Sequence, residues 1–319
     1  MPVFHLRMQQ RGALYSRRSA WPRRQSQRSR EKAIMLDRQP QENILKNKVS
    51  MTWDIHRLCN YHCPHCWFDG SWEAAKKDVI YLPPERWKDF WQHLYDHYGE
   101  IRVTIVGGEP FFYPGFTEII KNISNIHRIM ISTNGSLISD DFIRDVNPEK
   151  ITIAISFYAY LASFDKTLAT VKKLRKSNFA VGINYLAYPH PLQWNYDKIR
   201  LYRKIFKEAG CGWFFIASYW GKYDGRAYPD SYSPEDKAFI LEDCLVPQRL
   251  AFSLKAESSK GRLCWAGGKY ASISAGGRIY RCGTCGVEIG DVHNTPVQLS
   301  ERPIACPVDD CKCGEYIPA

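Results

Sequence analysis

Three cysteines stand within eight residues of one another, in the stretch CNYHCPHC at residues 59–66. Structural zinc sites and iron–sulfur cubes are usually closed by four protein ligands. Cys59, Cys63 and Cys66 supply only three thiolates, which leaves one metal position open for a cofactor or a substrate. The alternative is a zinc site or a closed cluster that takes His62 or His65 as its fourth ligand.

The elements that must position these thiolates are six apolar runs that alternate with amphipathic stretches. The runs that predict strands are 51–57, 101–106, 128–132, 150–157, 179–187 and 212–218. The stretches that predict helices are 83–98, 116–123, 140–146, 164–176 and 196–210. This alternation predicts an α/β fold, a partial (β/α)6 barrel of parallel strands with helices packed outside.

The first expected helix tests this interpretation. Trp87, Phe90, Trp91, Leu94 and Tyr98 recur at steps of three and four residues and form one apolar face. We expect this face to pack on the sheet.

In such a fold the loops at the carboxyl ends of the strands hold the chemistry. The cysteine trio follows the first expected strand, GGEP at 107–110 follows the second, and STNG at 132–135 follows the third. Gly107 and Gly108 have no Cβ, so a ligand can approach their backbone closely, and Pro110 fixes the turn that leaves the strand.

The CxxxCxxC spacing after a first strand, followed by GGEP at the end of the second, resembles the radical S-adenosylmethionine (radical SAM) superfamily over about residues 51–220. This resemblance implies that Cys59, Cys63 and Cys66 hold a 4Fe-4S cluster whose fourth iron binds SAM. One electron then cleaves SAM to methionine and a 5′-deoxyadenosyl radical, which abstracts hydrogen from a substrate. The cofactors supply this chemistry, and the protein supplies orientation, dryness and redox tuning.

The resemblance also implies which residues bind SAM. The GGEP segment, Gly107, Gly108, Glu109 and Pro110, would receive the amino group, with Glu109 either bonding to it or serving as a loop carboxylate that accepts backbone N–H groups. Asn134 follows the third strand, although an Asn-Gly pair also marks an ordinary turn. No residue is assigned a catalytic role.

Ser156 on the fourth strand matches a position that binds the ribose or the carboxylate of SAM in relatives. The sequence departs from the family after it, because many relatives continue with an apolar residue, Asp and Gly, whereas this chain continues with Phe157, Tyr158 and Ala159 and so lacks the acidic ribose contact. These two rings would shape the substrate pocket or pack in the core.

A second group of cysteines lies near the C-terminus. KYASISAGGRIYR at 269–281 predicts a hairpin that returns Cys282 toward Cys264. With IGDV at 289–292, this region resembles the twitch and SPASM extensions, which implies one auxiliary 4Fe-4S cluster; zinc is the alternative. The candidate ligands are Cys264, Cys282, Cys285, Cys306, Cys311 and Cys313. Cys211 and Cys244 are expected to be ordinary buried thiols.

The net charge of +11 is concentrated at the N-terminus, where residues 1–50 hold twelve Lys and Arg against three acidic residues. We expect a basic, disordered arm over 1–50, a radical SAM barrel over 51–230, and a linker helix with an auxiliary-cluster domain over 231–319. The arm also resembles a transit peptide, and translation could begin at Met35 or Met51. No apolar run spans a membrane, and a cytoplasmic protein is expected.

Three functions are compatible with these features. The first is a radical SAM enzyme that matures a ribosomally made peptide, with a flavodoxin or ferredoxin as electron donor and a separate protein for peptide recognition. The second is a radical SAM dehydrogenase or rearrangement enzyme that acts on a small metabolite. The third is a non-catalytic iron–sulfur or zinc protein that binds RNA through its arm, although nucleic acid is the less favoured partner.

Overall fold

The computed structural model describes residues 49–66, 80–242, 258–293, 297–309 and 311. All of them belong to one compact unit of the chain, Gln39–Ala319. The expected basic arm, Cys244 and Cys313 lie outside the described residues.

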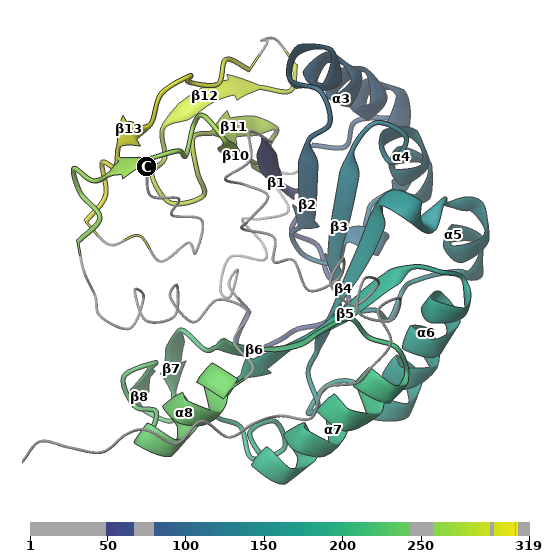
Figure 1. Cartoon of the computed structure of the whole chain (residues 1–319), viewed down its shortest axis with the longest axis vertical. Coiled ribbons are helices and arrows are strands. Elements are labelled where there is room, and N and C mark those ends of the chain that lie inside the picture. The colour runs from purple at the N-terminus through teal and green to yellow at the C-terminus, as the bar shows by residue number, and fades with distance from the viewer. Residues whose placement is uncertain (1–48, 67–79, 243–257, 294–296, 310, 312–319) are drawn as a thin grey trace, which may run out of the picture. The chain divides into compact units, whose positions relative to one another are not determined.

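Six parallel strands form the body of one sheet. They are β1 (Ser50–Asp54), β2 (Arg102–Val106), β3 (Arg128–Thr133), β4 (Ile151–Phe157), β5 (Ala180–Ala187) and β6 (Phe214–Ser218). Each lies within or beside a stretch that the sequence predicts as a strand. The sheet is curved and open, so the prediction of a partial barrel is confirmed (Figure 1).

Five helices follow the predicted pattern and lie along the outer side of the curved sheet (Figure 1). They are α3 (Pro84–Tyr98), α4 (Phe116–Ile123), α5 (Asp140–Asp145), α6 (Phe164–Lys176) and α7 (Tyr196–Glu208), with short 3-10 turns η1 (Pro110–Phe112) and η2 (Pro148–Lys150). The side chains of Ser139, Ser163 and Asn195 accept N–H groups at the starts of α5, α6 and α7. These caps satisfy backbone donors that a helix start leaves free.

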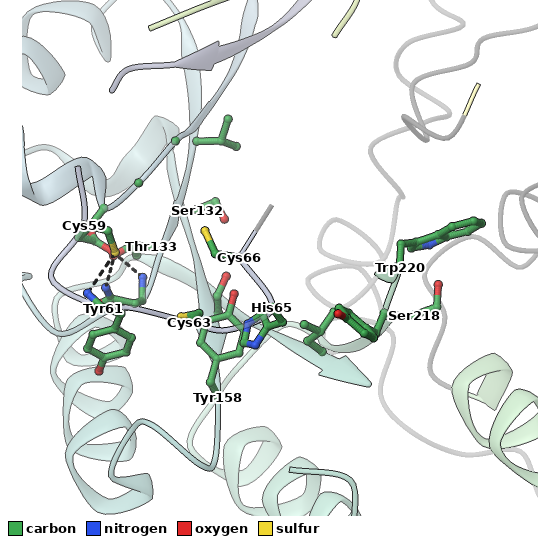
Figure 2. A pocket seen from close by; sticks show the side chains of 18 residues that line it. Cys59, Tyr61, Cys63, His65, Cys66, Ser132, Thr133, Tyr158, Ser218 and Trp220 are labelled. Atoms are coloured by element: carbon green, nitrogen blue, oxygen red, sulfur yellow. Dashed lines mark hydrogen bonds between the residues drawn. The ribbon is translucent and has the colours of Figure 1, made fainter. Parts of the chain in front are cut away.

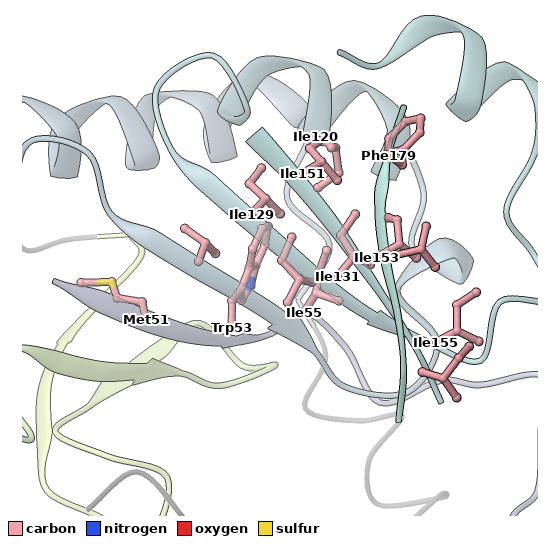
Figure 3. Close-up of a cluster of buried hydrophobic side chains, with 14 of the residues drawn as sticks. Met51, Trp53, Ile55, Ile120, Ile129, Ile131, Ile151, Ile153, Ile155 and Phe179 are labelled. Atoms are coloured by element: carbon pink, nitrogen blue, oxygen red, sulfur yellow. The ribbon is translucent and has the colours of Figure 1, made fainter. Parts of the chain in front are cut away.

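The core lies between this sheet and its helices (Figure 3). Alternate residues of β1 point into it, because successive side chains of a strand face opposite ways. The Trp53 ring lies 4.3 Å from that of Trp87 and 5.5 Å from that of Trp91, measured between centroids. The predicted apolar face of α3 therefore packs on β1, and burial of each large ring contributes about 2–3 kcal/mol.

The C-terminal region continues the same sheet. Its elements are β7 (Gly221–Tyr223), β8 (Arg226–Tyr228), α8 (Pro234–Glu242), β9 (Leu263–Cys264), β10 (Tyr270–Ile273), β11 (Arg278–Tyr280), β12 (Glu288–Asp291) and β13 (Ile304–Ala305). The predicted hairpin is β10–β11, and β12 pairs antiparallel with β11. The sequence did not indicate that β10 also pairs in parallel with β1, with Ser50 opposite Tyr270. The described sheet therefore has nine strands.

Within the described ranges, no helix combines the length and the apolar character that a membrane crossing requires.

Candidate functional site

One pocket of about 320 Å³ lies where the six parallel strands end (Figure 2). Residues from the carboxyl end of every one of these strands, or from the loop that follows it, line the pocket. They are Cys59, Tyr61, Cys63, His65 and Cys66 after β1; Val106, Gly107, Gly108 and Glu109 at β2; Ser132, Thr133 and Asn134 at β3; Ser156 and Tyr158 at β4; Leu186 at β5; and Ser218, Tyr219 and Trp220 at β6. The cysteine loop, GGEP and STNG thus lie together at this end of the strands, where the chemistry was predicted.

The three cysteines of the β1 loop are half-buried and not disulfide-bonded. The Tyr61 amide donates to Cys59 Sγ at 3.3 Å, and Asn134 Nδ2 donates to the same sulfur at 3.9 Å. Burial, and to a smaller extent the neighbouring Cys59 and Cys66, raise the pKa of Cys63 to about 12, because three negative sulfurs repel one another. All three become thiolates together only beside a compensating cation, so this donor set fits a metal group.

The positions of the potential ligands also bear on the kind of metal group that this loop could hold. Within the described ranges, no three His, Cys, Asp or Glu side chains converge closely enough to hold a single metal ion. A 4Fe-4S cluster needs no such convergence, because each cysteine binds a different iron. The His62 side chain is not part of the pocket lining. His65, the other histidine that could close a zinc site, does line the pocket, so the three thiolates on one loop are compatible with a cluster and the zinc alternative stays open.

The two glycines of GGEP bring the β2 loop against the cysteine loop. A Cβ on Gly107 would lie 2.2 Å from His56 O, and one on Gly108 would lie 2.0 Å from Leu58 O. The Gly108 amide donates to His56 O at 2.7 Å, and the Glu109 amide donates to Leu58 O at 2.8 Å. The sequence predicted close approach of a ligand, whereas the described close approach is by the chain itself.

Glu109 is fully buried and joins three loops. Its carboxylate accepts the Thr133 hydroxyl at 2.6 Å, the Asn134 amide at 2.7 Å and the Phe111 amide at 3.3 Å. Burial raises the pKa of Glu109, and these three hydrogen bonds oppose the rise. The described contacts are those of the loop carboxylate, which was one of the two roles predicted. Contact with the amino group of SAM stays a prediction.

The remaining predicted SAM contacts are placed as follows. Asn134 and Ser156 line the pocket, and Asn134 Nδ2 also donates to Asn60 Oδ1 at 2.9 Å, which ties the β3 loop to the cysteine loop. Pro110 is buried, starts η1 and does not line the pocket. Phe157 packs in the core, and Tyr158 lines the pocket, so each takes one of the two roles expected for this pair.

Aromatic side chains gather around His65, which lines the pocket together with Cys63 and Cys66. The His65 ring lies between Tyr158 and Tyr188, at centroid distances of 4.5 and 4.9 Å. Its Nδ1 is hydrogen-bonded to the Tyr160 hydroxyl at 2.5 Å, while Nε2 has no partner among the described residues. Burial lowers the pKa of His65 to about 4, so the ring is neutral at pH 7. Tyr158 was expected from the sequence as a pocket residue, whereas the sequence contains no signal for Tyr188.

His56 is a second residue that the sequence analysis missed. Its Nε2 donates to Glu109 O at 2.8 Å, and the ring is fully buried. It therefore fixes the GGEP segment to the chain that enters the cysteine loop.

The C-terminal cysteines also gather, at a different place. Cys264 and Cys282 lie in one buried cluster, and Cys285 packs against it. The Ala266 amide donates to Cys264 Sγ at 3.4 Å and the Cys285 amide donates to Cys282 Sγ at 3.3 Å. Cys306 follows β13, which pairs with β9 so that Ile304 lies opposite Cys264. Cys311 is buried, and its ligand role, like that of Cys313, stays a prediction.

A parallel partial barrel with three thiolates on the loop after its first strand defines a class: enzymes that hold a catalytic metal cluster at the carboxyl ends of their strands. Residues 53–193 match the family described as the radical SAM superfamily. The matched segment is less than half of the chain and carries Cys59, Cys63, Cys66 and GGEP, and enzymes of this family use a 4Fe-4S cluster and SAM.

The similarity to known proteins extends beyond this segment. An AdoMet-dependent heme synthase of Methanosarcina barkeri is 21% identical, over 77% of this chain and 80% of that protein. The antilisterial bacteriocin subtilosin biosynthesis protein AlbA of Bacillus subtilis is 23% identical over 72% of this chain, which corresponds to 54% of AlbA. Streptococcus suis SuiB bound to precursor peptide SuiA has the same fold, with a TM-score of 0.57 at 16% identity over 88% of this chain and 71% of SuiB.

Proposed function

We propose that the enzyme matures a ribosomally made peptide, with the pocket of Figure 2 as its reaction chamber. The observation that carries the proposal is the character of the lining. Its only side chain with a carboxylate is Glu109, which three hydrogen bonds occupy, and no Lys or Arg lies among the described lining residues. Tyr61, Tyr158, Tyr219 and Trp220 supply apolar surface with few polar groups, which suits a neutral peptide side chain.

The residues have separable tasks in this proposal. Cys59, Cys63 and Cys66 would hold the cluster, and the loops with Gly108 and Asn134 hold the cysteine loop in place. When bound, the cluster supplies the electron that splits SAM into methionine and the 5′-deoxyadenosyl radical, which abstracts hydrogen from the substrate. The aromatic side chains around His65 keep water away from the reacting atoms.

The C-terminal cysteines would hold one auxiliary 4Fe-4S cluster. Support comes from the clustering of Cys264, Cys282 and Cys285 and from the amide donors that point at two of the sulfurs, since such N–H groups tune iron–sulfur clusters. A flavodoxin or ferredoxin as electron donor, a separate peptide-recognition protein and a cytoplasmic location remain predictions. The division into domains at residues 50 and 230 also remains a prediction. Strand β10 of the expected C-terminal domain pairs with β1 of the expected barrel, so one sheet includes strands of both.

The second candidate, action on a small metabolite, is favoured by the match that spans 80% of the heme synthase. A metabolite with phosphate or carboxylate groups would need basic side chains, and the described lining has none. The two candidates are therefore distinguished by the charge of the group that enters the pocket.

The experiment uses anaerobically reconstituted full-length protein, SAM and a strong reductant. We expect Cys63→Ala to abolish 5′-deoxyadenosine formation, and Cys211→Ala, which alters a buried thiol outside the pocket, to preserve it. Retained SAM cleavage in Cys63→Ala would contradict the cluster assignment.

Cys282→Ala should retain SAM cleavage without substrate and lose substrate turnover. Peptides encoded by small reading frames beside the gene are then offered, and the products are examined by mass spectrometry. Modification of such a peptide supports the proposal. Unmodified peptides, together with turnover of an anionic metabolite, would overturn it.

A further inference from the structure

A buried arginine beside the C-terminal cysteines has three carbonyl partners and no carboxylate partner among the described residues. Arg281 immediately precedes Cys282, and only 6% of its surface is exposed. Its Nε donates to Ala266 O at 2.6 Å, Nη1 donates to Ala305 O at 2.9 Å, and Nη2 donates to Ile304 O at 2.7 Å. The guanidinium is permanently charged, so a full positive charge is held inside the protein.

Each of these contacts lies next to a different candidate ligand. Ala266 is two residues after Cys264, Ala305 is the residue before Cys306, and Arg281 itself is the residue before Cys282. The guanidinium therefore ties together three chain segments, and each of them carries one cysteine. The pairing of β13 with β9, the hydrogen bonds of the Cys306 backbone with Gly261 and Arg262, and the β10–β11 hairpin also join neighbouring segments, whereas the guanidinium contacts all three at one point.

The surrounding chain is built to admit this side chain. Gly267 has φ +88°, and a Cβ there would lie 2.6 Å from Arg281 Cγ. The glycine thus serves two needs, the left-handed backbone of the turn and space for the arginine stem. The Gly267 amide donates to Tyr270 O at 2.7 Å, which anchors this turn to the start of β10.

The electrostatics point to an anionic occupant. A buried charge is costly unless it is paired, and carbonyl dipoles solvate a guanidinium only in part. A metal group bound by four thiolates carries net negative charge and would complete the pairing. Such second contacts are also the means by which proteins set the reduction potential of a cluster.

We propose that Arg281 is the positioning residue of the C-terminal metal site, holding the segments of Cys264, Cys282 and Cys306 together and balancing the negative charge of the cluster they bind. This inference rests on the auxiliary cluster of the proposed function. It adds a residue that binds no metal itself and acts through the backbone beside the ligands.

The test uses the full chain with Cys59, Cys63 and Cys66 changed to alanine, so that iron and electron paramagnetic resonance report the C-terminal site alone. The variants are Arg281→Met, which removes the charge, and Arg281→Lys, which keeps the charge and loses the three-point fork. Arg278→Met is the matched control, because Arg278 is an exposed arginine on the same strand, β11.

We expect Arg281→Met to lose more than half of the cluster. In the clusters that remain, the one-electron equilibrium should shift at least tenfold against reduction, equivalent to a potential about 59 mV more negative. Arg281→Lys should lose occupancy but keep a potential near that of the parent protein, and Arg278→Met should change neither quantity. The direction of the shift follows because a nearby positive charge stabilises the reduced, more negative cluster.

Parent-like occupancy and potential in Arg281→Met would overturn the inference. An equal loss of the SAM-binding cluster, when Arg281→Met is placed in the otherwise wild-type chain, would also overturn it, since Arg281 would then serve the whole fold. If the C-terminal site holds no auxiliary 4Fe-4S cluster, the parent protein itself, before any change at Arg281, will contain zinc or no metal there. That result would refute the proposed cluster and is distinguishable from a failure of the inference about Arg281.

Discussion

The contact between the GGEP loop and the cysteine loop can be tested with a single methyl group. In Gly108→Ala the new Cβ would lie 2.0 Å from Leu58 O, 2.5 Å from Leu58 C and 2.7 Å from Arg57 C. All three atoms belong to the backbone, so no side-chain rotation can relieve the overlap. The two loops must separate by about 1 Å to bring the nearest pair to a tolerable distance.

The energetic cost follows from the contacts that this separation breaks. Overpacking costs about 1–3 kcal/mol, and weakening the hydrogen bonds from the Gly108 and Glu109 amides to His56 O and Leu58 O adds about 1 kcal/mol each. The total of roughly 3–5 kcal/mol is less than the stability of many domains of this size. We therefore expect the variant to fold with a displaced cysteine loop.

The consequence for chemistry is larger than the consequence for folding. A displacement of about 1 Å at a reacting centre can reduce the rate about 100-fold. We expect 5′-deoxyadenosine formation by reconstituted Gly108→Ala to fall by at least about that factor. Iron content and thermal unfolding are measured on the same samples.

Gly99→Ala is the control. Gly99 has a positive φ, +69°, which Gly108 lacks, and no heavy atom lies within 4 Å of the position of its Cβ, so a methyl group there strains the backbone but displaces no neighbour. It should lose about 1 kcal/mol of stability and keep its rate of SAM cleavage. A Gly108→Ala enzyme with wild-type iron content and rate would refute the argument that this loop contact positions the cluster.

Two further changes test the buried carboxylates. Glu109→Gln replaces one carboxylate oxygen by an NH2 group that faces hydrogen-bond donors. We expect the free energy of unfolding, measured by denaturant titration, to fall by about 1–3 kcal/mol. Glu118→Gln, at an exposed position, is the control and should show no measurable fall. For Asp54, burial outweighs the Arg57 charge and raises the pKa to about 6. Its stabilising effect is complete below its ordinary pKa of 3.8 and is lost as the pH rises through about 6, a change of up to about 3 kcal/mol. Between about pH 5 and about pH 7, roughly 1.4 kcal/mol of this fall should appear in the unfolding free energy of the wild type and less in Asp54→Asn; equal falls would contradict the assignment.

The elements of the barrel were predictable because their signals are local. The run that became β4 is mostly apolar, with Thr152 and Ser156 as its polar residues, and most of its side chains are buried, as expected for a parallel strand covered on both faces. The apolar face of α3 and the polar caps of α5, α6 and α7 also depend on residues that are close together in the sequence. Strand ends then placed the cysteine loop, GGEP and STNG at one edge of the sheet.

What the sequence could not show depends on pairs that are far apart in the chain. Ser50 and Tyr270 are paired across 220 residues, and no periodicity reports such a parallel contact. The role of Gly108 required knowledge of what its missing Cβ would strike, and that of Glu109 required the positions of Thr133 and Asn134. Arg281 gave no signal, because its partners are backbone carbonyls, which every residue possesses.

The pairing of β10 with β1 also answers how the two groups of cysteines relate. Cys282 lies two residues beyond Tyr280, which is opposite Ser272, so it is level with Tyr270 and hence with Ser50 at the start of β1. Cys59 follows the other end of β1, where the pocket begins at the level of Val106 and Ser132. The five residues of β1 span roughly 13 Å between these levels. Cys282 and the clustered Cys264 therefore lie too far along the sheet to ligate the same group as Cys59, Cys63 and Cys66.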